Sequence, residues 1–295
     1  MRIRSKIGML FVLMSPVLLF SLFTATDMTE SSKWKSTTAS TVTLPGIETS
    51  YNEKNMTTLT VVRTIPRRKR SAQEFCSNHN DRKASDDLLR SDRERSQPDR
   101  RFSSSSYWEA RYKNGGNSGA GSYGKLADFK AQIINDIVRA NAVRSVTEFG
   151  VGDGNQLRLA SYPRYIGVDV SPTILQKAKT QWSQDPSKQF FIATPGNVSL
   201  VSSEMTLSLD VIYHLIELPV FQQYMDDLFK AAERFVVIYA FDRTERIAPH
   251  VLYRKFTDYI NIRFPCWKLM KMIPNPWKGS GGADFYVYER STSDE

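Results

Sequence analysis

The sequence predicts an α/β protein built on a doubly wound, mostly parallel sheet of seven strands with an antiparallel terminal hairpin. Three observations predict this fold class. Short apolar runs alternate with segments of helical periodicity over residues 106–290. The apolar runs are nearly continuous, as is typical of parallel strands that are covered on both faces. Two further apolar runs, joined by a Pro/Gly-rich loop, close this part of the chain.

The elements are expected in a regular order. A short helix over residues 107–112, a glycine-rich loop over 115–124 and a helix over 126–140 precede the first strand. Five strands are expected at 145–149, 165–169, 189–193, 207–213 and 234–240. The helices between and after them are expected at 155–161, 171–182, 219–232 and 256–262. Closing strands are expected at 267–273 and 283–288, and the acids Asp226 and Asp227 are expected on a solvated helix face.

Composition divides the chain unevenly, which favours one folded domain rather than two. Residues 27–105 hold few large apolar side chains and many Ser, Thr, Arg and Asp, too little apolar surface to offset the entropy of ordering. The predicted parts are a cytosolic tail (1–6), a transmembrane signal anchor (7–25), a disordered stem (26–105), one α/β domain (106–290) and a tail (291–295).

The N-terminus carries the pattern of a membrane anchor. Arg2, Arg4 and Lys6 precede an apolar run over residues 7–25, close to the ~20 residues that a helix needs to cross a bilayer. Positive charge before the run predicts a cytosolic N-terminus. The domain would then lie in the lumen of the endoplasmic reticulum or Golgi, as in a single-pass type II membrane protein. A cleaved signal peptide is the alternative.

Three features of the sequence bear on a lumenal location. Asn55 and Asn197 begin glycosylation sequons. Residues 67–70 form a basic run that resembles a proprotein-convertase site, so release by cleavage after Arg70 is one interpretation and a plain basic run the other. Cys76 and Cys266 could pair in an oxidising lumen, or could be two free thiols.

A glycine-rich turn after the first predicted strand carries the most chemical information in the chain. Its spacing is G-x-G-x-G, and the residues expected to face a ligand are Glu148, Gly150, Gly152, Asp153 and Asp169. Neighbouring parallel strands end at the same edge of a sheet, so these acids and the bare glycine backbone suit a nucleoside. Asp169, at the end of the second strand, is placed to bind ribose hydroxyls, although capping of the following helix is also open.

The acids distinguish between two classes of ligand. A dinucleotide site has the spacing G-x-G-x-x-G and places pyrophosphate at a helix N-terminus. Two carboxylates would repel a pyrophosphate but suit a cation with an amino group and a sulfonium. The run V-T-E-F-G-V-G-D-G from Val146 resembles the first motif of class I S-adenosylmethionine-dependent methyltransferases. The resemblance implies a Rossmann-like fold and S-adenosyl-L-methionine as cofactor. NAD, or no ligand, is the alternative.

The predicted strand at 207–213 resembles the fourth-strand motif of that family, which brings residues to the cofactor's methyl group. Asp210 is expected in its second half, facing the cofactor, with Tyr213 and His214 at its end. A histidine there can take a proton from an acceptor hydroxyl, which makes His214 the first candidate base and His250 the second. A structural His214 bonded to a loop carbonyl, and a His250 at a helix start, are the alternatives.

The segment before the first strand is expected to fold over the cofactor, as in related enzymes. Trp108 and Tyr112 would then offer aromatic faces to the sulfonium. This segment and the glycine turn resemble a bacterial-type methyltransferase group with members in glycan-modifying contexts. One departure from the family is the run Phe190–Thr194, which lacks the acid that many members place near the adenine. The adenine would then have to be held by the backbone or by Asn197.

These observations together predict a methyltransferase that O-methylates a glycan or another hydroxyl acceptor in the secretory lumen. Methylation of a small metabolite or a protein side chain, a catalytically inactive binding module, and a nucleotide-sugar or NAD enzyme remain open. Much of the formal charge of +9 lies near the N-terminus, so no nucleic-acid partner is expected. No Cys/His cluster has metal-ligand spacing, so no metal is expected. The sequence leaves the oligomeric state open.

Overall fold

A computed structural model describes residues 102–196, 198–277 and 282–291. Within these ranges no helix is long and apolar enough to span a bilayer. Several predictions lie outside the described residues: the anchor at 7–25, the stem, the basic run at 67–70, and the residues Asn55, Cys76 and Asn197. Cys266 is disulfide-bonded in the structure.

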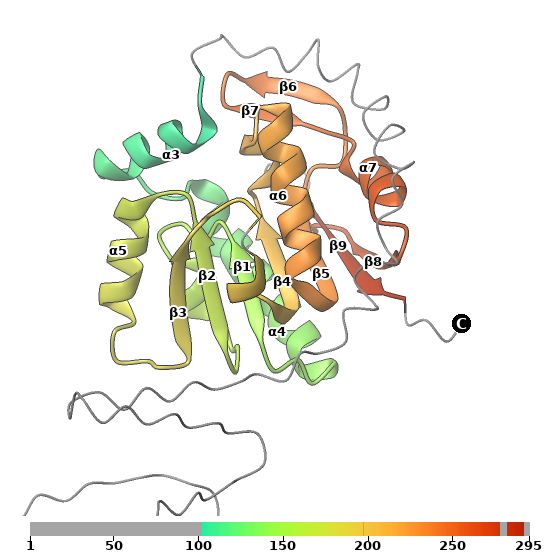
Figure 1. The fold of residues 1–295 in the computed structure, drawn as a ribbon, viewed down its shortest axis with the longest axis horizontal. Coiled ribbons are helices and arrows are strands. Elements are labelled where there is room, and N and C mark those ends of the chain that lie inside the picture. The colour runs from blue at the N-terminus through green and yellow to red at the C-terminus, as the bar shows by residue number, and fades with distance from the viewer. Residues whose placement is uncertain (1–101, 197, 278–281, 292–295) are drawn as a thin grey trace, which may run out of the picture. The chain divides into compact units, whose positions relative to one another are not determined.

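A seven-stranded sheet in the order β3-β2-β1-β4-β5-β9-β8 forms the centre of the domain (Figure 1). Its strands are β1 (Val146–Phe149), β2 (Tyr165–Asp169), β3 (Lys188–Ile192), β4 (Ser203–Leu209), β5 (Ala232–Ala240), β8 (Trp267–Ile273) and β9 (Asp284–Arg290). The first five pair in parallel, and β9 runs antiparallel to both β5 and β8. The predicted fold class, with its antiparallel terminal hairpin, is therefore confirmed.

Helices cover both faces of the sheet. They are α4 (Gly124–Ala140), α5 (Pro172–Gln181), α6 (Leu218–Ala231) and α7 (Phe256–Arg263), whereas α3 (Ser104–Lys113) lies beyond the carboxyl ends of the strands. One buried cluster joins α6 and α7 to the sheet, and a second joins α4 and α5 to it. Side chains of β5 alternate between the two clusters, as Val236 and Val237 do, because successive residues of a strand point to opposite faces. Figure 1 shows α6 in front of the sheet, with α4 lying behind it.

Two predicted elements differ from the structure. The helix expected at 155–161 is only a short 3₁₀ turn, η3 (Gln156–Leu159). The fourth strand, expected at 207–213, spans 203–209 instead. It ends there because Asp210 has a φ of 60°, which an extended strand does not allow. Tyr213 and His214 consequently lie in a 3₁₀ turn, η5 (Ile212–His214), beyond the strand end.

A two-stranded hairpin between β5 and α7 was not predicted. Its strands are β6 (Glu245–Ala248) and β7 (Val251–Tyr253), and His250 lies in the turn that joins them. The interpretation of His250 as a helix-start residue is therefore wrong. The side chains of β6 are mostly exposed, so this strand lacks the apolar alternation by which strands are recognised. In Figure 1 the hairpin lies beyond the carboxyl ends of the central strands, near α6.

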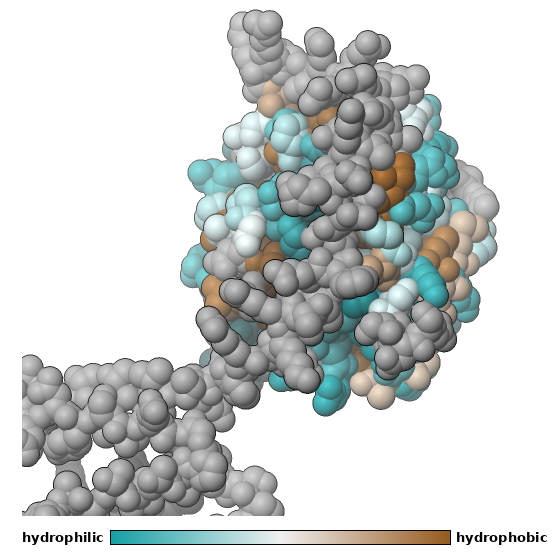
Figure 2. Space-filling view, turned by 45° about the vertical axis from the view of Figure 1, so that its right-hand side comes forward, coloured by the Kyte–Doolittle hydropathy of each residue, from teal (hydrophilic) through white to brown (hydrophobic). Residues whose placement is uncertain are grey.

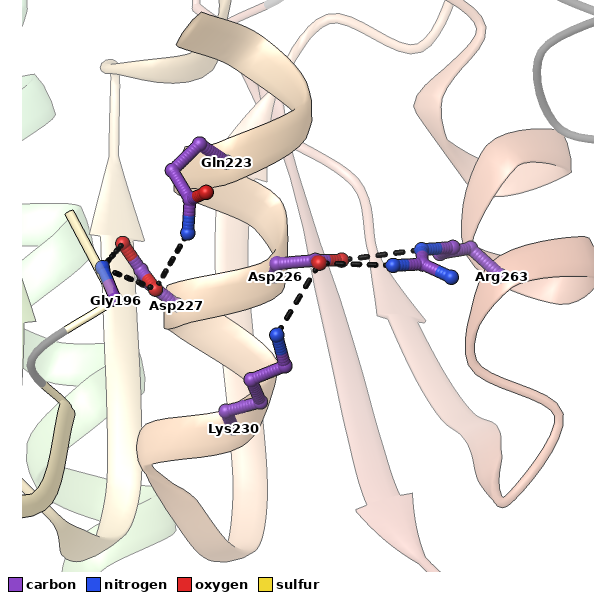
Figure 3. A network of polar contacts seen from close by, with 6 residues as sticks. All are labelled: Gly196, Gln223, Asp226, Asp227, Lys230 and Arg263. Atoms are coloured by element: carbon purple, nitrogen blue, oxygen red, sulfur yellow. Dashed lines mark hydrogen bonds and ion pairs between the residues drawn. The ribbon is translucent and has the colours of Figure 1, made fainter. Parts of the chain in front are cut away.

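The two acids on α6 are not on a solvated face (Figure 3). Asp226 accepts two hydrogen bonds from the Arg263 guanidinium of α7, at 3.1 and 2.8 Å, and forms an ion pair with Lys230. Asp227 is buried and accepts hydrogen bonds from the backbone N–H of Gly196 and from Gln223. Asp226 thus ties α6 to α7, and Asp227 ties α6 to the loop after β3.

The part of the domain surface that Figure 2 shows in colour is mixed in polarity. In the space-filling view, hydrophobic residues form small patches between hydrophilic ones (Figure 2). The edge strand β8 exposes three large apolar side chains, Leu269, Met270 and Met272. The pairing of β8 with β9 shifts register between Leu269 and Lys271, and such an irregularity in an edge strand disfavours further strand pairing.

Candidate cofactor and active site

A pocket lies at the carboxyl ends of the central parallel strands. It is lined by residues of α3, the glycine turn and the loops after β2 and β4. The predicted site residues that line it are Trp108, Tyr112, Glu148, Gly150, Gly152, Asp153, Asp169, Asp210 and His214. His250 is not among the residues that line this pocket. The pocket is at the edge of the sheet where doubly wound folds bind their ligands.

The glycine turn brings bare backbone to the wall of the pocket. Gly150 and Gly152 have φ angles of 87° and 57°, which side-chain-bearing residues rarely adopt. A Cβ on Gly150 would lie 2.5 Å from a methyl group of Val211, and one on Gly152 would collide with the hydroxyl of Ser118. Both positions therefore require glycine, for their backbone conformation and for space.

Two buried carboxylates stand beside this turn. Burial raises the pKa of Glu148 to about 7, although the hydroxyl of Tyr165, which donates to Glu148 Oε2 at 2.7 Å, partly opposes the shift. Burial also raises the pKa of Asp169, which accepts from the N–H groups of Gly152 at 2.9 Å and Ser171 at 3.0 Å. The capping interpretation of Asp169 is therefore compatible with its place in the pocket wall. Carboxylates held in this way favour a cationic ligand.

Asp153 joins the glycine turn to the segment above it. Its carboxylate accepts from the backbone N–H of Ser118 at 2.8 Å, the hydroxyl of Tyr123 at 2.6 Å and the N–H of Asn155 at 3.1 Å. Burial raises the pKa of Asp153, but these hydrogen bonds outweigh burial and hold the pKa below its usual value. Through Ser118 and Tyr123 this side chain fastens the overlying loop.

We call residues 104–123, which comprise α3 and the glycine-rich loop after it, the lid. Two carboxylates fix α3. Glu217 accepts from the backbone N–H of Ser104 at 2.8 Å. Glu109 accepts from the hydroxyls of Ser171, at 2.5 Å, and Thr173, at 2.8 Å, at the start of α5. These hydroxyls hold the pKa of Glu109 down at about 2. The lid lies over the pocket, as the sequence predicts.

Sequence reasoning missed Lys130, a buried lysine of α4 that lines the pocket. Its side chain is 1% exposed, and its Nζ lies 2.7 Å from Oδ2 of Asp210. Asp210 also accepts from the hydroxyl of Tyr213 at 2.8 Å. Lys130 has a helical spacing of four from the core residue Ile134, so a lysine on the apolar stripe of α4 was the available signal. Such a lysine needs a buried partner.

His214 borders the pocket beside the lid. Its ring meets the Trp108 ring edge-on, with ring centroids 4.9 Å apart. Its Nδ1 lies 2.9 Å from the backbone carbonyl oxygen of His250, and the two imidazole rings are stacked with centroids 5.9 Å apart. Burial lowers the pKa of His214 to about 4, so the ring is neutral at physiological pH. A neutral histidine at a pocket wall can accept a proton.

The side chains of the site offer two kinds of chemistry. His214 supplies a group that can accept a proton, and the carboxylates and Lys130 supply charges that can bind a ligand. The described residues contain no group of three or more His, Cys, Asp or Glu side chains that could hold a metal ion.

Comparisons with known proteins bear on the fold. No protein-family model and no curated protein matches the chain. Among solved structures, it is similar to the N-methyltransferase NodS from Bradyrhizobium japonicum in complex with S-adenosyl-L-homocysteine, with a TM-score of 0.54 and 14% identity over 65% of this chain and 100% of that chain. The methyltransferase domain of bacterial CtHen1 matches with a TM-score of 0.47 and 17% identity over 57% of this chain and 100% of that chain.

Magnesium protoporphyrin IX methyltransferase from Synechocystis, with bound S-adenosyl-L-homocysteine, matches with a TM-score of 0.48 and 12% identity over 63% of this chain and 97% of that chain. The NodS match shows that the domain has the Rossmann-like fold of the class I S-adenosylmethionine-dependent methyltransferases.

Proposed function

We propose that this chain is an S-adenosyl-L-methionine-dependent methyltransferase that acts on a hydroxyl acceptor. The observation that carries the proposal is the pocket at the carboxyl ends of β1, β2 and β4. There Glu148 and Asp169 are buried beside a turn in which Gly150 and Gly152 cannot be replaced by residues with a Cβ. This combination of negative charge and bare backbone suits a nucleoside that carries a cationic amino-acid tail.

The residues of the pocket fit the parts of that cofactor. Asp169 is placed to accept hydrogen bonds from the ribose, and the glycine turn leaves space for the tail. The tail carries an amine and a carboxylate, for which Glu148 and Lys130 supply the complementary charges. Asp210, which pairs with Lys130, would orient that cation. Trp108 and Tyr112 on α3 close the pocket from above and exclude water.

The chemistry asks little of the protein beyond alignment and one proton transfer. A bound cofactor would supply a methyl group on a sulfonium. The acceptor oxygen would bond to the methyl carbon in line with the C–S bond, which breaks to release S-adenosyl-L-homocysteine. The lid and the strand ends would hold the acceptor oxygen in line with the methyl group. Such alignment lowers the activation barrier, because the two reactants no longer have to meet and orient in solution. His214 accepts the hydroxyl proton on Nε2. Trp108, whose ring lies against His214, would offer its aromatic face to the positive charge of the sulfonium.

A glycan is the acceptor we favour, because the predicted anchor and stem match the plan of membrane-bound enzymes of the secretory lumen. Under this proposal the chain is a type II membrane protein of the endoplasmic reticulum or Golgi, released where cleavage follows Arg70. A small metabolite or a protein side chain is the alternative acceptor, and an inactive binding module the alternative function.

The test is incorporation of label from S-adenosyl-L-methionine carrying a labelled methyl group. Purified full-length protein is incubated separately with fractionated glycans, lipids and proteins. We expect label in the glycan fraction, stable to protease and lost with the Asp169→Ala variant. Label in the protein or metabolite fraction would contradict the glycan acceptor. Cofactor binding without transfer to any fraction would favour the inactive module.

A further inference from the structure

The β6–β7 hairpin lies against the candidate base, although the proposed function gives it no role. The turn between Ala248 and Val251 carries the His250 carbonyl, which faces His214. β7 also packs on the η5 turn that contains His214. A segment inserted between β5 and α7 therefore reaches the pocket wall.

The carbonyl of His250 decides where His214 carries its proton. His214 Nδ1 lies 2.9 Å from that oxygen. A carbonyl oxygen can only accept, so Nδ1 must bear the hydrogen in this contact. In the neutral ring Nε2 is then unprotonated. No hydrogen bond from the described residues to Nε2 is present. This is the tautomer that a general base at the pocket wall requires.

The ring of His250 lies parallel to the ring of His214. The two imidazoles are parallel within 2°, with centroids 5.9 Å apart. The His250 ring also stacks on Tyr107 of the lid, with centroids 4.8 Å apart and an angle of 19°. Among the described residues, the hydrogen bond between these two histidines joins His214 Nδ1 to the His250 carbonyl, and none joins one ring to the other. Orientation, rather than proton relay, follows from this arrangement.

The base of the hairpin is held firmly enough to keep the carbonyl in place. Arg254, directly after β7, is buried and donates to the carbonyl oxygens of Leu215 and Ile216 at 2.6 and 2.7 Å. These two residues follow His214 in the chain. The hairpin and the segment that carries the candidate base are thus joined to each other just after the contact.

We propose that the β6–β7 hairpin is a positioning element for His214: the His250 carbonyl holds the proton on Nδ1, and the stacked His250 ring holds the imidazole plane, leaving Nε2 free at the pocket. The inference rests on the proposed function only in treating His214 as the base. It makes His250 a positioning residue rather than a second base. The groups that bear on the charge of His214 are Arg111 of α3, Asp210 after β4 and His250 itself.

Nitrogen NMR of the full-length protein tests this without any acceptor. The protein is labelled with ¹⁵N-histidine, and because the chain has three histidines, a His214→Asn variant assigns the His214 signals. The variants are His250→Gly, which removes the ring, and His250→Phe, which keeps an aromatic ring to stack. Ile247→Ala, at an exposed position of the same hairpin, is the matched control. Stabilisation by S-adenosyl-L-homocysteine reports on the cofactor site in each variant.

The expected wild-type result is one neutral form of His214, protonated on Nδ1, between pH 6 and pH 8. His250→Phe and Ile247→Ala should keep this form. His250→Gly retains the carbonyl but loses the ring beside His214, so the imidazole can turn away from that oxygen and a mixture of both tautomers should result. A wild-type His214 protonated on Nε2 would overturn the inference, even if His250→Gly does not fold. The inference would also be overturned if His214 in the His250→Gly variant kept the wild-type tautomer. A His250→Phe variant with the same mixture of His214 tautomers as His250→Gly would overturn it too. Failure of S-adenosyl-L-homocysteine to stabilise the wild type would count against the proposed function alone.

Discussion

At the scale of single residues, the site depends on ionisable side chains whose pKa values are shifted by burial. Glu148 and His214 have opposite shifts with the same cause, since burial disfavours the charged form of each. Glu148 is therefore partly protonated near pH 7, and His214 is neutral. The sequence predicted both as site residues from strand-end patterns, and both line the pocket, Glu148 from β1 and His214 from the η5 turn beyond the end of β4. It could not show their protonation, which depends on side chains distant in sequence.

Glu148 should couple cofactor binding to pH. Because its pKa is about 7 and a cationic ligand favours the ionised carboxylate, affinity for S-adenosyl-L-methionine should fall as pH is lowered from 7 to 5. The limiting slope is about tenfold per pH unit for one coupled proton. Calorimetry in buffers of different ionisation heat should show proton release on binding. Glu148→Gln should remove this slope, and an equal slope in that variant would contradict the assignment.

His214 should act as a base over an unusually wide pH range. With a pKa of about 4, it stays neutral down to about pH 5, so kcat/KM for the acceptor, measured with saturating S-adenosyl-L-methionine, should lack an acid limb near 6.5 and fall only below pH 5. His214→Ala should lower turnover by roughly 10²- to 10⁴-fold, the usual contribution of general-base catalysis. Affinity for S-adenosyl-L-homocysteine should be nearly unchanged. A folded His214→Ala variant with wild-type turnover would remove His214 from the mechanism.

At the scale of elements, the sequence predicted the helices and strands that have a periodic apolar pattern. It did not predict the features that depend on contacts between residues distant in sequence. The parallel strands and the helices α4, α5 and α6 follow from apolar runs and helical spacing. The end of β4 does not, because the apolar run continues through Val211 and Ile212 while Asp210 has a positive φ and its carboxylate bonds to Lys130 and Tyr213. The hairpin was missed because the side chains of β6 are mostly exposed and β7 has only three residues, and Lys130 was missed because its partner Asp210 is distant in sequence.

The lid should open when its carboxylate latch is weakened. Glu109 holds α3 to the first turn of α5 through the hydroxyls of Ser171 and Thr173, so Glu109→Gln should loosen that attachment. Limited trypsin digestion should then cut faster after Arg111 or Lys113, and S-adenosyl-L-homocysteine should dissociate faster. Asp136→Asn, an exposed acid of α4 that pairs with Arg139, is the matched control. Equal digestion rates for the two variants would contradict the latch.

At the scale of the whole molecule, the N-terminal segment and the folded domain make separate predictions. The full-length protein should remain with membranes after alkaline extraction, because of the apolar run at 7–25, and should carry a glycosidase-sensitive glycan on Asn55. Cleavage after Arg70 would add a shorter form in the medium. Asn55→Gln should remove the shift in mobility that glycosidase causes. An unglycosylated protein that alkaline extraction releases would contradict the lumenal topology and leave the domain's chemistry untouched.

The central claim is that the domain binds S-adenosyl-L-methionine, and thermal unfolding with the product S-adenosyl-L-homocysteine tests it most directly. At 100 times its Kd a ligand adds about 2.7 kcal/mol to the free energy of unfolding, which should raise Tm by several degrees. Gly152→Arg should abolish this rise, because a side chain at a φ of 57° beside Ser118 fills the space of the ligand. NAD should leave Tm unchanged. A rise with NAD and none with S-adenosyl-L-homocysteine would contradict the cofactor assignment.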